Sequence, residues 1–200
     1  MRKYQNYSYK YIIAFDDGKL PKNKDGKTIL MGVKTNKTIL EDVFLREIEV
    51  DGLDATEKAL EIIREANPID VILLNGISYG GFNLMDAKRI WEETRIPIII
   101  YTKMKPDNKS VISALMKHFQ DWRERWEIIK NVLKISNGIH QIKIKEKEKP
   151  VYIEVIGISV EEATRILREN TIWGRTPEPI RIVEIMAEEI SKTYLQVKNK

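Results

Sequence analysis

Short apolar runs divide the first quarter of the chain into three predicted strands. The first covers residues 11–15 and ends directly in Asp16-Asp17-Gly18, and the next two cover residues 28–34 and 39–50. Residues 19–27, rich in Lys, Asn and Gly, separate the first two strands, and such segments are typical hairpin connections. We therefore expect the chain to open with an antiparallel meander.

The pattern then changes to helices that alternate with apolar strands. Helices are predicted over residues 55–66 and 84–94, and buried strands over residues 71–74 and 97–101. Asp54 stands where an N-cap would, and Asp107 and Ser159 do so before later helices. The helix that begins at Asp107 continues, with an interruption near Phe119, to about residue 133. Further helices are predicted over residues 159–169 and 180–195. A hairpin is expected over residues 139–154.

This order predicts one α/β domain over residues 1–200, with residues 1–10 and 196–200 as loose termini. Three antiparallel strands followed by strand–helix units give a mixed sheet, antiparallel then parallel, flanked by helices. The ribonuclease H-like fold has this order, and by pattern alone it is one candidate among several α/β folds.

Composition narrows the possible functions. The chain has no cysteine and only two histidines, which excludes zinc-thiolate sites, iron–sulfur clusters and histidine-rich metal centres. A net charge of +4 favours anionic partners weakly, and abundant Lys, Glu and Arg are typical of a thermophile. No apolar run approaches the roughly 18 residues of a membrane span, and the polar N-terminus lacks the apolar stretch of a signal peptide. We expect a cytoplasmic protein without a membrane partner.

Acidic and amide side chains stand at the predicted strand ends where α/β proteins place their sites. Asp16 and Asp17 follow the first strand, and Asn75 follows the buried strand over residues 71–74. Oxygen ligands of this kind bind Mg²⁺. The alternative for Asp16-Asp17-Gly18 is a plain turn. Asp51 and Asp54 could reach the same edge, and their alternative is a turn followed by a helix cap.

A glycine-rich segment and two lysines could bind a phosphate at this edge. Gly76, Gly80 and Gly81 make the loop flexible, and its backbone N–H groups could bind an anion. The spacing of these glycines matches neither a dinucleotide-binding motif nor a P-loop. Lys103 and Lys105 follow the next strand. A solvated surface lysine is the alternative for each.

Several stretches together resemble a known pattern: FDDG, VDGLDATEKALEIIREA, VILLNGISYGGFNLMDAKRIWEETRIPIIIYTKMKPD, DWRERW, VYIEVIGISVEEATRIL and RTPEPIRIVEIMA. They look like an archaeal family of unknown function that is distantly related to endonuclease V, over roughly residues 10–190. The resemblance implies the ribonuclease H-like fold. It also implies an Mg²⁺- or Mn²⁺-dependent site that cuts a DNA or RNA strand beside deaminated bases, chiefly inosine.

The resemblance assigns roles to individual positions. The family's first Asp falls on Asp16, its Glu near Asp54 or Asp51, its second Asp on Asn75 and its lysine on Lys103. Asp16, Asp54 and Asn75 would then hold the metal, with Lys103 completing the catalytic set. From their places in the chain, independently of the resemblance, the expected substrate contacts are Asp51, Gly76, Tyr79, Gly80, Gly81 and Lys105.

Two positions depart from the family pattern. Asn75 replaces a carboxylate with a neutral amide, and a histidine of the tail falls on Ile158. Metal-dependent phosphodiester cleavage needs negative charge to hold the ions, so we expect a weakly held ion and weak or no nuclease activity. Two alternatives stay open: a non-catalytic nucleic-acid-binding or interaction protein on the same fold, and an enzyme that acts on a small phosphorylated metabolite in the glycine-rich pocket.

Overall fold

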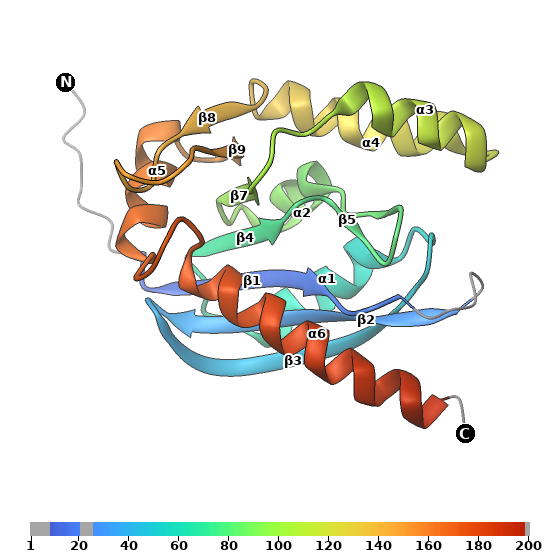
Figure 1. Cartoon of the computed structure of the whole chain (residues 1–200), viewed down its shortest axis with the longest axis horizontal. Coiled ribbons are helices and arrows are strands. Elements are labelled where there is room, and N and C mark those ends of the chain that lie inside the picture. The colour runs from blue at the N-terminus through green and yellow to red at the C-terminus, as the bar shows by residue number, and fades with distance from the viewer. Residues whose placement is uncertain (1–8, 21–25, 199–200) are drawn as a thin grey trace.

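A seven-stranded mixed sheet forms the centre of the molecule, in the order β3-β2-β1-β4-β7-β9-β8 (Figure 1). The computed structural model describes residues 9–20 and 26–198. Strands β1 (Tyr11–Asp17), β2 (Lys27–Asn36) and β3 (Ile39–Glu49) pair antiparallel. The predicted meander is therefore confirmed, while residues 21–25 of its first connection lie outside the described residues.

The second half of the sheet brings two parallel strands beside β1. Strand β4 (Val71–Asn75) pairs parallel with β1, with Phe15 opposite Leu74, and β7 (Ile98–Thr102) pairs parallel with β4. Strands β9 (Val151–Ile156) and β8 (His140–Ile142) complete the sheet as an antiparallel hairpin. Because β1 and β4 run side by side in the same direction, the residues that follow them meet at one edge.

Helices cover both faces of the sheet because its strand residues are apolar on both sides. Helices α1 (Ala55–Glu65), α2 (Ala87–Thr94) and α4 (Trp122–Ile135) lie on the face that buries Ile13 and Phe15. Helices α5 (Val160–Glu169) and α6 (Glu178–Lys198) lie on the face that buries Ile12 and Ala14, and α6 crosses the front of the view (Figure 1). Helix α3 (Asn108–His118) packs against α4. The predicted α/β fold is confirmed.

Two of the three predicted helix caps are confirmed. Asp107 accepts hydrogen bonds from the N–H groups of Lys109 and Ser110, and Ser159 accepts one from Glu162. The third prediction is wrong, because the Asp54 side chain makes no capping hydrogen bond.

Asn83 replaces Asp54 as the cap of α1. It is fully buried in β6 (Asn83–Leu84), which forms a small hairpin with β5 (Ser78–Tyr79) inside the segment predicted as a loop. Its Oδ1 accepts from the Ala55 N–H at 2.9 Å, and its Nδ2 donates to the Glu49 carbonyl at 2.9 Å. Asn83 thereby joins the end of β3, the start of α1 and the glycine-rich segment.

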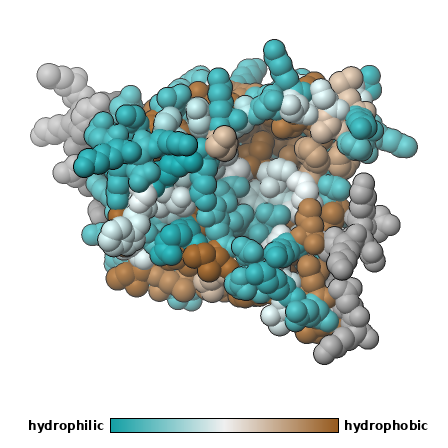
Figure 2. Space-filling model, viewed as in Figure 1, coloured by the Kyte–Doolittle hydropathy of each residue, from teal (hydrophilic) through white to brown (hydrophobic). Residues whose placement is uncertain are grey.

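The face seen in Figure 2 is hydrophilic over its middle and apolar along its lower edge, where β3 lies. Ile39, Leu40, Val43 and Leu45 of β3 are exposed. Within the described part of the chain, no helix combines the length and the apolar character that crossing a membrane requires.

Replacing Asn83 with alanine should destabilise the fold. The Asn83→Ala variant leaves the first N–H of α1 and the Glu49 carbonyl without these partners inside the protein, so we expect a loss of about 1–3 kcal/mol in the free energy of unfolding. Urea titration followed by circular dichroism measures it. Asn131→Ala in α4 is the control, because alanine favours a helix. Equal stabilities of the two variants would show that Asn83 does not hold these elements together.

Candidate functional site

The ends of β1 and β4 bring a carboxylate and an amide together. Asp16 lies near the end of β1 and Asn75 is the last residue of β4. Asn75 Nδ2 donates to Asp16 Oδ2 at 3.1 Å, and the backbone N–H of Asp17 donates to Asp16 Oδ1 at 3.0 Å. The predicted proximity of Asp16 and Asn75 is therefore confirmed.

A second carboxylate reaches this point from α6. Asn75 Nδ2 also donates to Glu184 Oε1 at 3.2 Å, so one amide group bridges two carboxylates. Lys103, just after β7, places its Nζ 2.7 Å and 2.8 Å from the two carboxylate oxygens of Glu184. The site thus consists of Asp16, Asn75, Lys103 and Glu184.

Glu184 was absent from the residues that the sequence singled out. Its signal lies in the apolar pattern of the last helix, where Ile180, Val183 and Ala187 are fully buried at helical spacing. Glu184 follows Ile180 by four residues and so shares its face. A carboxylate on the buried face of a helix is a candidate for a specific role.

The surroundings of Asp16 oppose its ionisation. Burial raises the pKa of the Asp16 carboxyl to about 7, and the negative charge of Asp17 adds to the rise, while the hydrogen bonds from Asn75 and from the Asp17 N–H act against it. Burial also raises the pKa of Asp17. A carboxylate in such a place is stabilised by any cation that reaches it.

The donor set suits a single hard cation. Asp16 and Glu184 offer carboxylate oxygens, and a half-turn of the Asn75 amide would place its Oδ1 where its Nδ2 now lies. Two carboxylates with an amide oxygen match the oxygen ligands of Mg²⁺, which keeps several waters. Among residues 9–20 and 26–198, no group of three or more Asp, Glu, His or Cys side chains could hold a metal ion.

The glycine-rich segment is bound to neighbouring acids instead of being open to a phosphate. The Gly80 N–H donates to Asp17 Oδ2 at 2.7 Å, the Phe82 N–H donates to Asp51 Oδ1 at 2.8 Å, and the Gly76 N–H donates to the Tyr101 carbonyl at 3.1 Å. The N–H groups of Gly76 and Gly80 are therefore already bonded within the protein. The phosphate contacts expected at Gly76, Gly80 and Gly81 stay predictions.

Asp51 and Asp54 support this segment. Asp51 binds Phe82, and Asp54 Oδ1 accepts from Asn83 Nδ2 at 2.5 Å and from the Glu49 N–H at 3.2 Å. These hydrogen bonds hold the glycine-rich segment in place. The roles of Asp51 and Asp54 at the metal or the substrate stay predictions.

Tyr79 and Lys105 differ in their access to a substrate. The Tyr79 side chain is fully buried and its hydroxyl donates to the Gly76 carbonyl at 3.2 Å, and its contact with a substrate stays a prediction. Lys105 is exposed just beyond Lys103, and its contact with a phosphate stays a prediction.

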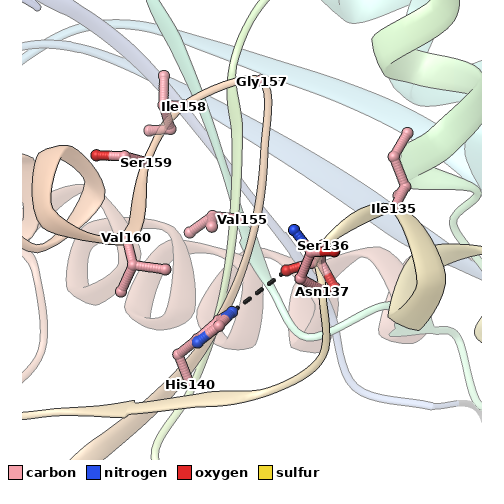
Figure 3. A pocket seen from close by; sticks show the side chains of 9 residues that line it. All are labelled: Ile135, Ser136, Asn137, His140, Val155, Gly157, Ile158, Ser159 and Val160. Carbon is pink, nitrogen blue, oxygen red and sulfur yellow. Dashed lines mark hydrogen bonds between the residues drawn. The ribbon is translucent and has the colours of Figure 1, made fainter.

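Ile158 lies at the opposite end of the sheet from Asp16. Strand β9 runs antiparallel to β7, so its end at Ile156 is paired with Ile98, whereas the site lies beyond Thr102. Ile158 lines a separate cavity of about 510 Å³ together with His140, which is within 3.3 Å of the Ser136 carbonyl (Figure 3). The structure therefore corrects the placement of the tail residue: Glu184, not Ile158, joins the site.

A family model described as Endonuclease dU matches residues 10–191 of the chain. The chain belongs to the endonuclease dU family. A UPF0215 protein of Pyrococcus furiosus is 38% identical over 187 residues, which covers 90% of this chain and 92% of that protein. A UPF0215 protein of Thermococcus gammatolerans is 36% identical over 186 residues, covering 90% and 91%. The resemblance to an archaeal family is confirmed.

Solved structures place this endonuclease dU family member beside endonuclease V in fold. A protein of unknown function from Archaeoglobus fulgidus has a TM-score of 0.76 at 31% identity, with 90% of this chain and 97% of that chain covered. Endonuclease V of Ciona intestinalis, solved with a DNA that contains an inosine followed by a ribo-adenosine, has a TM-score of 0.60 at 16% identity, covering 94% and 86%. At that identity the likeness shows a shared fold.

The raised pKa of Asp16 should make this endonuclease dU family member less stable as the pH rises. Between the ordinary carboxyl pKa near 4 and the folded value of about 7, the folded state binds more protons than the unfolded state, so stability falls with increasing pH across this window. The Asp16→Asn variant removes that titration. We expect it to raise the free energy of unfolding by about 1–3 kcal/mol at pH 8 and to change it little at pH 4.

Denaturant titrations at several pH values in EDTA test this expectation. The control is Asp42→Asn, which changes an exposed carboxylate of β3. If Asp16→Asn changes the free energy of unfolding equally at pH 4 and pH 8, the ionised Asp16 carboxylate does not destabilise the folded protein as its surroundings indicate.

Proposed function

We propose that this protein is a divalent-metal-dependent endonuclease that cuts a nucleic-acid strand beside a deaminated base and holds its ion weakly. The observation that carries the proposal is the convergence of Asp16, Asn75 and Glu184 at the carboxyl ends of two adjacent parallel strands. Two comparisons support it: the family model is described as Endonuclease dU, and endonuclease V of the same fold has been solved with DNA that contains inosine.

Asp16 and Glu184 would hold an Mg²⁺ or Mn²⁺ ion, with Asn75 Oδ1 as a neutral third ligand. Such an ion, when bound, supplies positive charge to a phosphodiester and activates water. The missing charge at Asn75 explains why we expect weak ion binding.

Lys103 would bind a phosphate group of the strand. Its Nζ is paired with Glu184. Glu184 cannot give its full charge to both an ion and Lys103, so ion binding would leave the ammonium group available to a phosphate oxygen at the same edge. This arrangement makes Lys103 a binding residue that responds to the ion.

The loop between α5 and α6 offers a surface for bases close to Lys103. Arg175 Nη1 donates to the Lys103 carbonyl at 3.0 Å, which fixes this loop beside the site. Trp173, two residues earlier, is 77% exposed, and Met104 is 75% exposed. An exposed aromatic ring near positive charge suits stacking on the bases of a single strand of DNA or RNA. The single strand is therefore the partner that we propose.

A non-catalytic binding protein is the second candidate, and a specific observation favours it. The Asn75 amide and the Lys103 ammonium already satisfy the two carboxylates without any ion. The third reading, an enzyme for a small phosphorylated metabolite, loses its support because the Gly80 N–H is occupied by Asp17.

Restoring the missing charge should tighten ion binding. We expect wild-type protein to bind Mn²⁺ weakly and Asn75→Asp to bind it about tenfold or more tightly, because a third carboxylate adds direct Coulomb attraction. Asp16→Asn should lose the binding. Isothermal titration calorimetry measures all three proteins, with Asp42→Asn as the control for an unrelated carboxylate. Unchanged affinity in both Asp16→Asn and Asn75→Asp would place the ion elsewhere.

Cleavage is the direct test of the proposed activity. We expect the wild-type protein with Mn²⁺ to nick a labelled single strand that contains one deoxyuridine or one inosine, slowly, and to leave the undamaged strand intact. Asp16→Ala should reduce the rate by about 100-fold or more, since it removes a charged ligand, whereas Asp42→Ala should not change it. A wild-type protein that binds the strand but never cuts it with Mg²⁺ or Mn²⁺ would support the non-catalytic alternative.

A further inference from the structure

Strand β3 forms one edge of the seven-stranded sheet and exposes apolar side chains there (Figure 1). Val43 is 36% exposed and Leu45 is 42% exposed. Val43 is paired with Val33 of β2, and Leu45 is paired with Met31. Both partners belong to the core beneath α6. Val43 and Leu45 therefore lie on the same face of the sheet as α6.

Helix α6 leaves this pair of side chains uncovered. It packs against β1 and β2 and reaches β3 at Glu47, whose carboxylate accepts a hydrogen bond from the Tyr194 hydroxyl at 2.5 Å. Val43 and Leu45 remain exposed beside the helix and form an apolar strip along the edge of the sheet. Apolar side chains that lie together on an exposed edge strand mark a place where another protein strand can pair.

The backbone of β3 also has a free side. The Val50 N–H donates to the Gly26 carbonyl at 3.0 Å and so continues the ladder between β2 and β3. In an antiparallel ladder only every second residue directs its N–H and C=O groups at the partner strand. The register from Val50 runs without interruption past Val43, so these groups of Val43 and Leu45 point away from β2. The Leu45 carbonyl accepts instead from Arg46 Nη1 at 2.9 Å.

A β-bulge limits the length of edge that can pair. Lys34 of β2 is opposite Asp42, whereas the next residue, Thr35, is opposite Leu40, so Glu41 is an extra residue in β3. A bulge bends a strand and interrupts regular pairing. The straight part of the free edge therefore starts at Asp42.

The charge of β3 opposes a nucleic-acid partner at this edge. From Ile39 to Glu49 the strand carries four acidic side chains and a single basic one, Arg46. Such a surface repels the phosphates of a nucleic-acid strand. A protein strand is the remaining kind of partner, and its side chains must match those of residues 42–46.

A second copy of the same strand provides that match. When two β3 strands run antiparallel about a two-fold axis at Phe44, Val43 lies opposite Leu45 of the second copy, and Asp42 lies opposite Arg46 of the second copy. Because the axis is perpendicular to the sheet, each contact occurs twice and α6 of both copies lies on the same face. The apolar side chains then meet on the α6 face and the opposite charges meet on the α1 face.

We propose that two copies of this chain associate by antiparallel pairing of β3 with β3, centred on Phe44, into one continuous sheet. The free backbone groups of Val43 and Leu45 hydrogen-bond to those of Leu45 and Val43 of the second copy. The inference does not depend on the proposed nuclease activity, because the site lies at the strand ends of β1 and β4 and stays open in the pair.

The charged residues around this window set the register more than the strength of the pair. Arg46 already pairs with Glu61 and Glu65 of α1, so Asp42 of the second copy adds little free energy. Outside the window, Glu41 and Glu47 would approach each other across the two copies. Each has a lysine of β2 within 4.0 Å, which reduces their repulsion.

Sedimentation velocity of the full chain at several concentrations tests the association. Since the window is short, we expect a weak dimer, with wild-type protein passing from monomer to dimer across about 1–100 μM. Val43→Lys and Leu45→Glu should each raise the dissociation constant about tenfold or more, because each buries a charge against an apolar side chain of the second copy. Met116→Lys, the same kind of change at an exposed residue of α3, is the matched control and should leave the dissociation constant unchanged.

A mixture of the two variants tests the register. In a mixed pair, Lys at position 43 of one chain lies opposite Glu at position 45 of the other, and the second contact keeps Val43 opposite Leu45. We expect an equimolar mixture of Val43→Lys and Leu45→Glu to recover most of the wild-type affinity, although neither variant dimerises well alone. This recovery would also show that both variants are folded.

The remaining outcomes overturn the inference. Wild-type protein that stays monomeric up to about 100 μM excludes the association at the strength that we expect. A dimer that neither variant weakens forms through another surface. A dimer that both variants weaken, but that the mixture does not recover, contradicts the pairing of position 43 with position 45.

Discussion

The Asn75 amide is the interaction on which the site depends. It donates one hydrogen bond to Asp16 on β1 and another to Glu184 on α6, and so holds two negative groups together at the edge of the sheet. Two carboxylates that share a partly buried place repel each other unless donors or cations lie between them. Without an ion, Asn75 and the ammonium group of Lys103 provide that compensation.

The fold brings these groups together through strand direction and helix packing. Parallel pairing of β1 with β4 puts Asp16 beside Asn75, and the next parallel strand, β7, delivers Lys103 to the same edge. Helix α6 crosses the sheet on the face toward which Asp16 points and buries Ile180 and Val183 there, which sets the position of Glu184. On the opposite face, an apolar pocket of about 210 Å³ opens near the same edge.

Local patterns in the sequence predicted the strands and helices well because their apolar periodicity is strong. The meander, the buried strands β4 and β7, and the caps at Asp107 and Ser159 follow from residues that lie close together in the chain. The first two members of the site, Asp16 and Asn75, follow from the rule that parallel strands end at a common edge. The hydrogen bonds of Asn83 could not be predicted in this way, because its partners at Glu49 and Ala55 are about 30 residues distant.

Long-range contacts also explain the placements that were wrong. Ile158 follows a glycine in the expected local context, but the antiparallel direction of β9 puts it at the far end of the sheet. Tyr79 belongs to a glycine-rich segment that reads as an exposed loop, yet the β5–β6 hairpin buries its ring completely. Glu184 looks like an ordinary acidic residue of a helix until tertiary packing places it, half-buried, beside Asn75.

We propose that Asp16, Asn75 and Glu184 form one ion site. The most direct test is a crystal of the protein soaked in Mn²⁺ and measured for anomalous scattering. We expect one anomalous peak within about 2–2.5 Å of carboxylate oxygens of both Asp16 and Glu184, with the Asn75 amide turned to present its oxygen and Lys103 displaced from Glu184. An anomalous map without a peak between these residues, with the Asn75 bridge and the Lys103–Glu184 pair intact at saturating Mn²⁺, would contradict it.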